Sequence, residues 1–324
     1  ESDTVEILSG VRNGKTIGAP ISLWVKNRDY ENWKDRMNVG PLETDKPVTA
    51  PRPGHADLAG VQKFGLSDIR DVLERASARE TAARVAAGAL YKQLLKQFDI
   101  KIFSHTVAIG SVAAENATRS NAEAEFLPLR CRDDNQEPRM MQLIDKAIEE
   151  GNTLGGISEI IATGVCSGLG TYTQWDQRLD ARIAAVMTSI PSVKGVAIGD
   201  DDISEKLGSE AQDEIIYESE KGFFRKSNHA GGIEGGISNG EDIVVRINIK
   251  PLPSLRKPLR SADIRTGKAV DAQKERADVC VVPAAGVVAE SMLAFVLAEA
   301  LTEKFGGDSI DDMKANFQQY MQRL

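Results

Sequence analysis

SARETAARVAAGALYKQLLKQF, residues 77–98, carries the strongest helix signal in the sequence. Ser77 and Glu80 have the spacing of a capping box, in which the serine hydroxyl accepts from the N–H of Glu80 and the carboxylate accepts from the N–H of Ser77. Alanines then occupy several faces, which is typical of a helix that is closely buried rather than solvated on one side. We therefore expect a core helix from Ser77 to about Phe98.

Periodicity and turn residues predict the other elements. Further helices are expected at residues 140–150, 174–189 and 284–304, the last ended by Gly306 and Gly307. Strands are expected at residues 101–109, 158–165, 193–198 and 243–249. Near the start, residues 6–8 and 17–25 predict a hairpin with a tight turn at Asn13-Gly14. Residues 27–54 are polar and aperiodic, which indicates a long surface connection of the kind that often carries function.

Composition limits the class of protein. The chain has 324 residues, of which 41% are hydrophobic, enough for one large core or two ordinary ones. No linker-like composition divides it, so we expect a single domain over residues 1–324. Its apolar runs are short and broken by charge, and no targeting segment is visible, so we expect no membrane span. A formal charge of −8 argues against a nucleic-acid surface.

The three cysteines, Cys131, Cys166 and Cys280, are widely separated and form no C-x-x-C pair. This spacing supports neither a disulfide framework nor a zinc site, and it favours a reducing compartment such as the cytosol or a plastid stroma.

Two short patterns occur twice. The spacing of Gly, Asn-Gly and Ile in residues 10–17 recurs in residues 236–243, and the tetrapeptide at 155–158 recurs at 235–238. Either the chain contains two related halves, or similar turns use similar residues.

Several catalytic motifs are missing from the sequence. Its three histidines, His55, His105 and His229, form no H-E-x-x-H motif, and there is no G-x-S-x-G elbow. We expect no metal site. The glycine-rich residues 228–240 lack the lysine of a P-loop and precede a strand; they indicate either a close approach of backbone to a ligand or a pair of turns.

Basic residues are concentrated between Arg52 and Arg84, which suits a small polyanionic ligand or a solvated basic face. Arg75 stands two residues before the predicted helix start, where free N–H groups and the helix dipole favour a phosphate or carboxylate. In the alternative, Arg75 and Arg79 pair with Glu74 and Glu80 on the surface.

Two other positions suit proton transfer. His55 follows a Pro-Gly turn, from which an imidazole would project toward a phosphate, although a loop histidine is often merely exposed. Arg276 and Asp278 precede the apolar run Val279–Val282, so both charges are expected at the edge of a buried element, where in a strand they would share one face. A plain ion pair is the alternative.

Six motifs, in order along residues 5–321, resemble those of the chorismate synthase family. They are EILSGV (6–11), RPGHAD (52–57), RASARETA (75–82), SNHAGG (227–232), GGIS (235–238) and RADVC through PAAG (276–286). The resemblance implies an α+β fold, specifically a β-α-β sandwich with helices packed between antiparallel sheets, to which the two repeated patterns add possible pseudo-twofold halves. It also implies a homotetramer that binds FMN in each subunit.

The activity implied by the resemblance is a reduced-FMN-dependent 1,4-anti elimination of phosphate from 5-enolpyruvylshikimate 3-phosphate. The product is chorismate, in the shikimate pathway of aromatic amino acid biosynthesis, and the expected location is the cytoplasm. NADPH or an external supply would reduce the flavin. The family opens with Gly-Glu-Ser-His-Gly, which does not occur in this sequence, so part of the proton-transfer apparatus is expected to lie outside it.

The resemblance also implies site residues. His55 helps to neutralise the departing phosphate, Ser77 and Arg79 organise anions with Arg75, and Asp278 handles a proton near the flavin. Pro191-Ser192 stands where relatives often carry Asn-Ala, and residues 250–254 depart from the commoner Lys-Pro-Thr/Ile-Ser-Ser/Thr. The implied FMN contacts are Arg75, Ala76, Ser77, Pro191, Ser192, Gly235, Lys250, Pro251, Leu252, Pro253, Ser254 and Arg276. A non-catalytic flavin- or phosphosugar-binding homologue is the alternative, and a flavin oxidoreductase is a weaker one.

Overall fold

The helix expected at residues 77–98 forms, but it begins differently from the capping-box prediction. A 3₁₀ turn, η1 (Ala78–Glu80), leads into α4 (Thr81–Lys96). The Ser77 hydroxyl accepts from the N–H of Arg79 at 3.2 Å, not from Glu80. The Glu80 carboxylate pairs with Arg84 at 3.0 Å. The reciprocal bond was therefore predicted wrongly, because an arginine one helical turn further on offers the carboxylate a charged partner.

A computed structural model describes residues 3–40, 46–220 and 222–324. The chain divides into two compact units. Unit 1 comprises residues 1–87 and 253–277, and unit 2 comprises residues 88–252 and 278–324. Helices and sheets occur throughout, so the fold is α+β, as expected.

Unit 2 contains a five-stranded antiparallel sheet with the order β6-β5-β7-β13-β8. The strands are β5 (Lys101–Ile109), β6 (Val112–Ala113), β7 (Gly156–Thr163), β8 (Val193–Ile198) and β13 (Ile243–Ile249). All four strands predicted for this region form, three of them with the predicted bounds. The buried side chains of β13 are branched and apolar, whereas β5 and β7 also bury polar residues, Ser104, His105, Thr106, Ser158 and Glu159.

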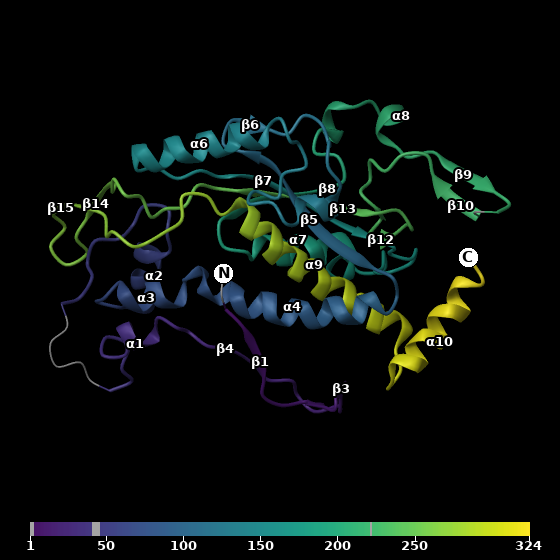
Figure 1. Cartoon of the computed structure of the whole chain (residues 1–324), viewed down its shortest axis with the longest axis horizontal. Helices are drawn as coiled ribbons and strands as arrows, with labels where there is room; N and C mark the ends of the chain where they lie inside the picture. The colour runs from purple at the N-terminus through teal and green to yellow at the C-terminus, as the bar shows by residue number, and fades with distance from the viewer. Residues whose placement is uncertain (1–2, 41–45, 221) are drawn as a thin grey trace. The chain divides into compact units, whose positions relative to one another are not determined.

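The helices of unit 2 include α6 (Glu137–Glu150), α7 (Leu179–Thr188) and α9 (Val282–Phe305), close to the predicted ranges (Figure 1). α9 packs on β5, β7 and α7. A Cβ added at Gly88 of α4 would lie 2.3 Å from the Cβ of Ser291 on α9, so these helices approach closely. By length and composition α9 could cross a membrane, but 72% of its apolar window is buried inside the protein, as in a core helix.

Shorter elements complete unit 2. A capping box at Ser309 starts α10 (Ile310–Met321), whose Phe317 ring lies 5.1 Å from that of Phe305. The others are α5 (Asn121–Ala124), η2 (Trp175–Gln177), η3 (Ile203–Glu205), α8 (Gly208–Ala211) and the hairpins β9 (Ile215–Glu218) with β10 (Gly222–Arg225) and β11 (Ile233–Glu234) with β12 (Ile237–Ser238).

Unit 1 begins with the predicted hairpin. β1 (Val5–Ile7) pairs with β4 (Leu23–Val25), and between them β2 (Val11–Arg12) pairs with β3 (Lys15–Thr16). The expected loop at 27–54 is largely irregular and includes α1 (Tyr30–Trp33); its residues 41–45 lie outside the described residues. A small core joins α2 (Asp57–Phe64) and α3 (Arg70–Arg75), neither of which was predicted, and β14 (Arg260–Ala262) pairs with β15 (Ala269–Asp271).

The two turns that suggested internal repetition differ in backbone. Asn13 and Gly14 both have positive φ, 51° and 71°, as a tight hairpin turn requires. In the second copy only Gly240 does, at 98°. The two turns therefore share residues but not backbone conformation at the asparagine.

Candidate active site

The motif at residues 52–57 builds an acid–base cluster in unit 1, in which Arg52 and Asp57 are buried and His55 is half-buried. The N–H of His55 donates to the carbonyl of Arg52 at 3.3 Å, and Gly54 has a φ of 80°. Proline at the second position and glycine at the third favour this turn. Asp57 then starts α2 with its side chain fully buried, and its Oδ1 lies 2.5 Å from Nδ1 of His55. The turn and the helix start thus bring the imidazole onto the carboxylate.

Arg52 holds the same carboxylate. Its backbone N–H and its Nε donate to Oδ2 of Asp57 at 2.9 and 3.0 Å, and its Nη2 reaches Oδ1 at 3.3 Å. Burial alone raises the pKa of Asp57, but the hydrogen bonds from His55 and Arg52 outweigh it and lower that pKa well below the ordinary value. Asp57 is therefore ionised at neutral pH.

This carboxylate determines how the imidazole is used. An ionised Asp57 favours a proton on Nδ1 of His55, so Nε2 becomes the nitrogen that can exchange a proton with a ligand. Among the described residues, no partner is bonded to Nε2. The His55 side chain is 17% exposed, enough for a ligand to reach it. Arg52 also donates from Nη1 to the hydroxyl of Ser254 at 2.6 Å, which links a predicted FMN-contact residue to the cluster.

The segment from Arg75 to Arg79 follows in the same unit. Arg75 ends α3, Ala76 caps that helix, and Ser77 caps η1. Neither surface pair of the alternative interpretation forms, because Glu74 pairs with Arg70 and Glu80 with Arg84. Arg79 pairs with Asp3. Within the described residues the Arg75 side chain has no hydrogen bond or ion pair, so its exposed guanidinium is available to an anion.

Several other predicted residues gather at one end of the sheet in unit 2. The N–H of Lys250 donates to the carbonyl of Ser192 at 2.9 Å. Ser192 follows Pro191 and has a φ of 71°, a left-handed conformation that is uncommon outside glycine and often found at functional sites. Thr153 donates to the carbonyl of Leu252, two residues beyond Lys250, at 2.8 Å. The loop after α7 and the segment after β13 are thus brought together.

Asp278 belongs to the same end of unit 2. It directly precedes Val279, whose carbonyl accepts from the N–H of Leu154 at 2.8 Å, next to Thr153. The suggestion that Arg276 and Asp278 share one face of a strand is wrong, because residues 272–279 form no strand and both side chains are exposed. Backbone bonds fix the segment at Val279 instead, three residues before α9 begins.

Gly235 lies apart from this group. It occupies the turn between β11 and β12 with a φ of 59°, and the next residue accepts from the N–H of Leu179 at the start of α7. Pro191 follows the other end of α7. Ten helical residues separate the two positions, which is a rise of about 15 Å.

The remaining predicted residues lie in unit 1. Pro253 adjoins Ser254, and Arg276 lies near the carboxylate of Asp29. The pKa of Asp29 is lowered mainly by hydrogen bonds from Asn32 and Trp33.

Arg52 and Asp57 were not assigned roles from the sequence. The signal that could have identified them was present, because a carboxylate two residues from a histidine, at a helix start after a Pro-Gly turn, is a natural support for an imidazole. Their mutual contact across the turn depends on backbone geometry that spacing alone does not give.

The site pairs a half-buried histidine with a fully buried carboxylate and an arginine, an arrangement that suits an enzyme that transfers protons to an anion. A family model described as chorismate synthase matches residues 1–302. The chain is 50% identical to a chorismate synthase of Alkaliphilus metalliredigens, across 99% of this chain and 86% of that protein. It is 51% identical to one from Desulforudis audaxviator, across 100% and 85%. A crystal structure of a chorismate synthase is 41% identical, with a TM-score of 0.79, across 99% of this chain and 84% of its own.

The chain belongs to the chorismate synthase family. Its activity is that of a lyase of the shikimate pathway, the elimination of phosphate from 5-enolpyruvylshikimate 3-phosphate to give chorismate. The non-catalytic alternative finds no support among relatives at this level of identity.

Proposed function

We propose that the Arg52–His55–Asp57 cluster is the acid–base element of the phosphate elimination. The observation that supports this is the 2.5 Å contact between Nδ1 of His55 and a fully buried, ionised carboxylate. The contact fixes the ring through Nδ1 and leaves Nε2 to give a proton to the phosphate as its C–O bond breaks. Arg52, which is 8% exposed, keeps the carboxylate charged and oriented.

Anion binding is proposed for the segment from Arg75 to Arg79 in the same unit. Arg75 offers a guanidinium with no partner among the described residues, and charge-assisted bonds to phosphate or carboxylate are among the strongest polar contacts. Arg79 would exchange Asp3 for the substrate, and the Ser77 hydroxyl, which caps η1, would donate its own proton to an anion. Together these groups suit a substrate with two carboxylates and a phosphate.

The cofactor is proposed to be reduced FMN. The residues fit a flavin phosphate in charge, because Arg75 and Arg276 are exposed cations in unit 1. The left-handed Ser192 and the linked Lys250 in unit 2 present backbone that the family uses for the same ligand. Ala76, Pro191, Pro251, Leu252, Pro253, Ser254 and Gly235 complete the proposed contacts. When bound, reduced FMN supplies transient electron density to the breaking C–O bond. Asp278 would accept the proton released as the C–H bond of the substrate breaks.

Further proposals follow from family membership. We assign residues 1–324 to one chorismate-synthase-like domain of the β-α-β sandwich type, acting as a homotetramer in the cytoplasm. The flavin is reduced either with NADPH by the protein itself or externally. Anaerobic mixing with FMN and NADPH tests this directly, since bleaching of the flavin absorbance indicates intrinsic reduction and a constant spectrum indicates an external supply.

His55→Gln tests the central proposal. Glutamine keeps a polar side chain but exchanges no proton, so single-turnover phosphate release with reduced FMN should fall about 100-fold or more, while substrate affinity stays within a few-fold. His229→Gln is the matched control, because His229 also contacts a carboxylate through Nδ1, that of Asp200 at 2.6 Å, yet lies in unit 2. An unchanged rate in His55→Gln, or an equal loss in both variants, would remove His55 from proton transfer.

A further inference from the structure

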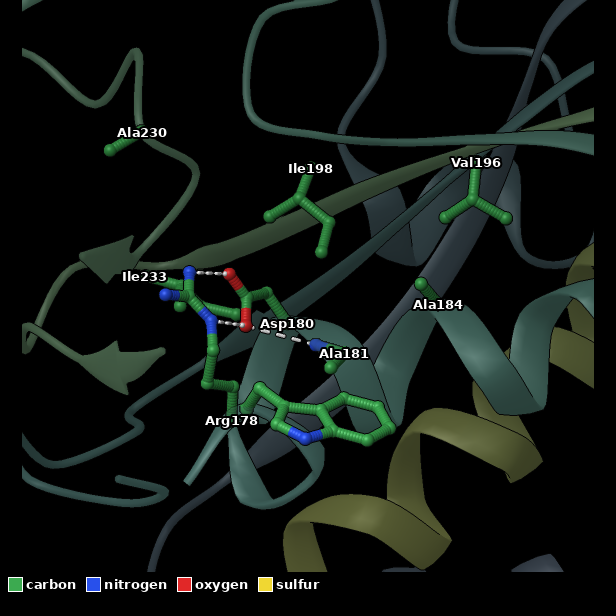
Figure 2. Close-up of a pocket in the computed structure, with 9 residues that line it drawn as sticks. Arg178, Asp180, Ala181, Ala184, Val196, Ile198, Ala230 and Ile233 are labelled. Carbon is green, nitrogen blue, oxygen red and sulfur yellow. Dashed lines mark hydrogen bonds and ion pairs between the residues drawn. The ribbon is translucent and has the colours of Figure 1, made fainter. Parts of the chain in front are cut away.

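A hollow of about 480 Å³ in unit 2 lies between α7 and β8 (Figure 2). Arg178 and Asp180 in its lining pair with each other, since Arg178 donates from Nε at 3.0 Å and from Nη2 at 2.5 Å. The other described residues of the lining are uncharged, so no charge is left there to orient a ligand. In unit 1, by contrast, an arginine pairs with a carboxylate that adjoins a proposed cofactor residue.

This arginine is Arg70, the first residue of α3. Its Nη2 donates to Oε1 of Glu275 at 2.9 Å, and its Nη1 lies 3.6 Å from Oε1 of Glu74. Its Cζ lies over the ring of Trp33, which ends α1, at 5.2 Å from the ring centroid. Only 14% of the Arg70 side chain is exposed. A guanidinium with a ring on its face and carboxylates at its edge is held in one orientation.

The start of α3 is itself fixed. The N–H of Arg70 and the N–H of Val48 both donate to Oδ1 of Asp68, at 2.8 and 2.9 Å. Ile69, which lies between Asp68 and Arg70 in the chain, is fully buried in the small core that α2 and α3 share. The backbone from which the Arg70 side chain extends is therefore anchored by both hydrogen bonds and packing.

Glu275, the partner of Arg70, lies in an irregular segment with little backbone support. The nearest bond between backbone groups before it runs from the N–H of Gln273 to the carbonyl of Ala50, at 3.0 Å. Residues 274–276 make no such bond within the part of the chain that the structure describes. The Glu275 carboxylate is instead held by side chains, by Arg70 and by Nε2 of Gln273 at 3.2 Å. The contact with Arg70 thus attaches this stretch to α3.

Arg276 directly follows Glu275. The Glu275 side chain is 20% exposed and lies against Arg70, whereas Arg276 is exposed and is proposed above to meet the phosphate of FMN. Arg75, the other cation proposed for that phosphate, ends α3, five residues after Arg70. One helix therefore carries Arg75 itself and also fixes the residue next to Arg276.

We propose that Arg70 is a positioning residue for the flavin phosphate, because its bond to Glu275 fixes the place of Arg276 relative to Arg75. The inference rests on the proposed FMN site, and it adds a residue that touches no ligand. A phosphate binds more tightly to two guanidinium groups at a fixed spacing than to groups that it must first order, since ordering a segment on binding costs conformational entropy.

Titration with oxidised FMN and with riboflavin, each followed by flavin fluorescence, tests this proposal without catalysis. Riboflavin has no phosphate, so its affinity reports on the rest of the flavin site. Arg276→Gln should weaken FMN binding about tenfold or more, and Arg70→Gln and Glu275→Gln should each weaken it about fivefold. Riboflavin affinity should stay within about twofold in all three variants. An equal loss for both flavins would show a general structural effect and overturn the positioning role.

The double variant Arg70→Gln with Arg276→Gln tests whether Arg70 acts through Arg276. Without the Arg276 cation, the loss of Arg70 should weaken FMN binding by less than about a further twofold. Glu74→Gln is the matched control, because it removes the other carboxylate beside Arg70 and leaves Glu275 in place. This control should keep FMN affinity within about twofold of the parent.

The outcomes separate the two proposals. If the parent does not bind FMN, or if Arg276→Gln binds it like the parent, the assignment of Arg276 to the flavin phosphate fails, and the role of Arg70 fails with it. If Arg276→Gln weakens FMN binding but Arg70→Gln and Glu275→Gln do not, only the role of Arg70 is overturned. Circular dichroism establishes that each variant is folded, and Glu275→Gln, at the more exposed end of the pair, carries the test if Arg70→Gln does not fold.

Discussion

Asp57→Asn should destabilise the protein by about 3–5 kcal/mol, the usual effect of removing one partner from a buried ion pair. The carboxylate accepts bonds from the N–H, Nε and Nη2 of Arg52 and from Nδ1 of His55, at 2.9, 3.0, 3.3 and 2.5 Å. Asparagine keeps the shape but removes the charge and replaces one acceptor by a donor. The Arg52 side chain, 7% exposed, is then left as a buried cation with Ser254 as a neutral partner.

The pH dependence of this difference follows from the lowered pKa of Asp57. The folded-state pKa lies below the ordinary value of 3.8, so the ion pair's contribution is fully present above about pH 4 and is lost as pH falls toward the folded-state pKa. The difference in free energy of unfolding between the parent and Asp57→Asn should therefore be constant from about pH 5 to about pH 8. Below about pH 4 the difference should shrink, because the parent loses the same charge by protonation.

Urea unfolding followed by far-UV circular dichroism measures the difference. Asp71→Asn is the matched control, because Asp71 is an exposed carboxylate on α3 of the same unit. It should change stability by no more than about 0.5 kcal/mol. A loss below about 1 kcal/mol in Asp57→Asn would refute the reasoning that the carboxylate compensates a buried cation.

Turnover separates a positioning role from a purely structural one. If Asp57 orients His55, the folded Asp57→Asn protein should lose turnover and shift its pH–rate profile, and Asp57→Glu should recover part of the rate because it restores the charge. The opposite outcome is a variant that is less stable but keeps its rate per folded molecule and its pH–rate profile. Asp57 would then have only a structural role.

Three further outcomes are expected. Arg75→Ala should weaken substrate or phosphate binding by about 1.5–3 kcal/mol in calorimetry, and a change of a few tenths would argue for an idle surface arginine. Asp278→Asn should lower single-turnover phosphate release at saturating reduced FMN by about 100-fold, with affinity within a few-fold. Burial, only partly opposed by Glu159, lowers the pKa of His105 from 6.5 to about 4, so the unfolded state binds the proton first as pH falls. Stability should drop by about 3 kcal/mol between pH 6.5 and 4 in the parent, and His105→Gln should flatten this slope in acid titrations followed by circular dichroism.

Local elements were predictable where the sequence pattern and the tertiary environment agree. β5, β8 and β13 have the predicted bounds because their apolar residues are bracketed by turn residues, and α9 begins and ends within two residues of its prediction. α2 and α3 were missed, because these helices are short and their core is supplied by each other rather than by a long periodic stripe.

The site was predictable in residue identity more than in arrangement. The motif identified His55, which contacts a buried carboxylate. The role of Arg52 could not be predicted, because it depends on the turn that brings Arg52 onto Asp57. The capping box at Ser77 was predicted from spacing alone, but it does not form because the Glu80 carboxylate pairs with Arg84 instead. The contacts between Ser192 and Lys250 and between Thr153 and Leu252 join segments distant in sequence, so they depend on the sheet order.

The burial of the two proposed proton-transfer sites gives a way to separate catalysis from folding. Asp57 is fully buried beneath His55, whereas Asp278 is exposed in an irregular segment fixed by the bond from Leu154 to Val279. The same change, Asp to Asn, should therefore cost about 3–5 kcal/mol of stability at the first position and almost none at the second. If Asp278→Asn loses turnover without loss of stability, its carboxylate acts on a ligand, since it supports no buried charge in its own fold. If it loses stability as well, the exposed segment is held by that side chain, and the assignment of Asp278 to proton transfer would no longer follow from activity alone.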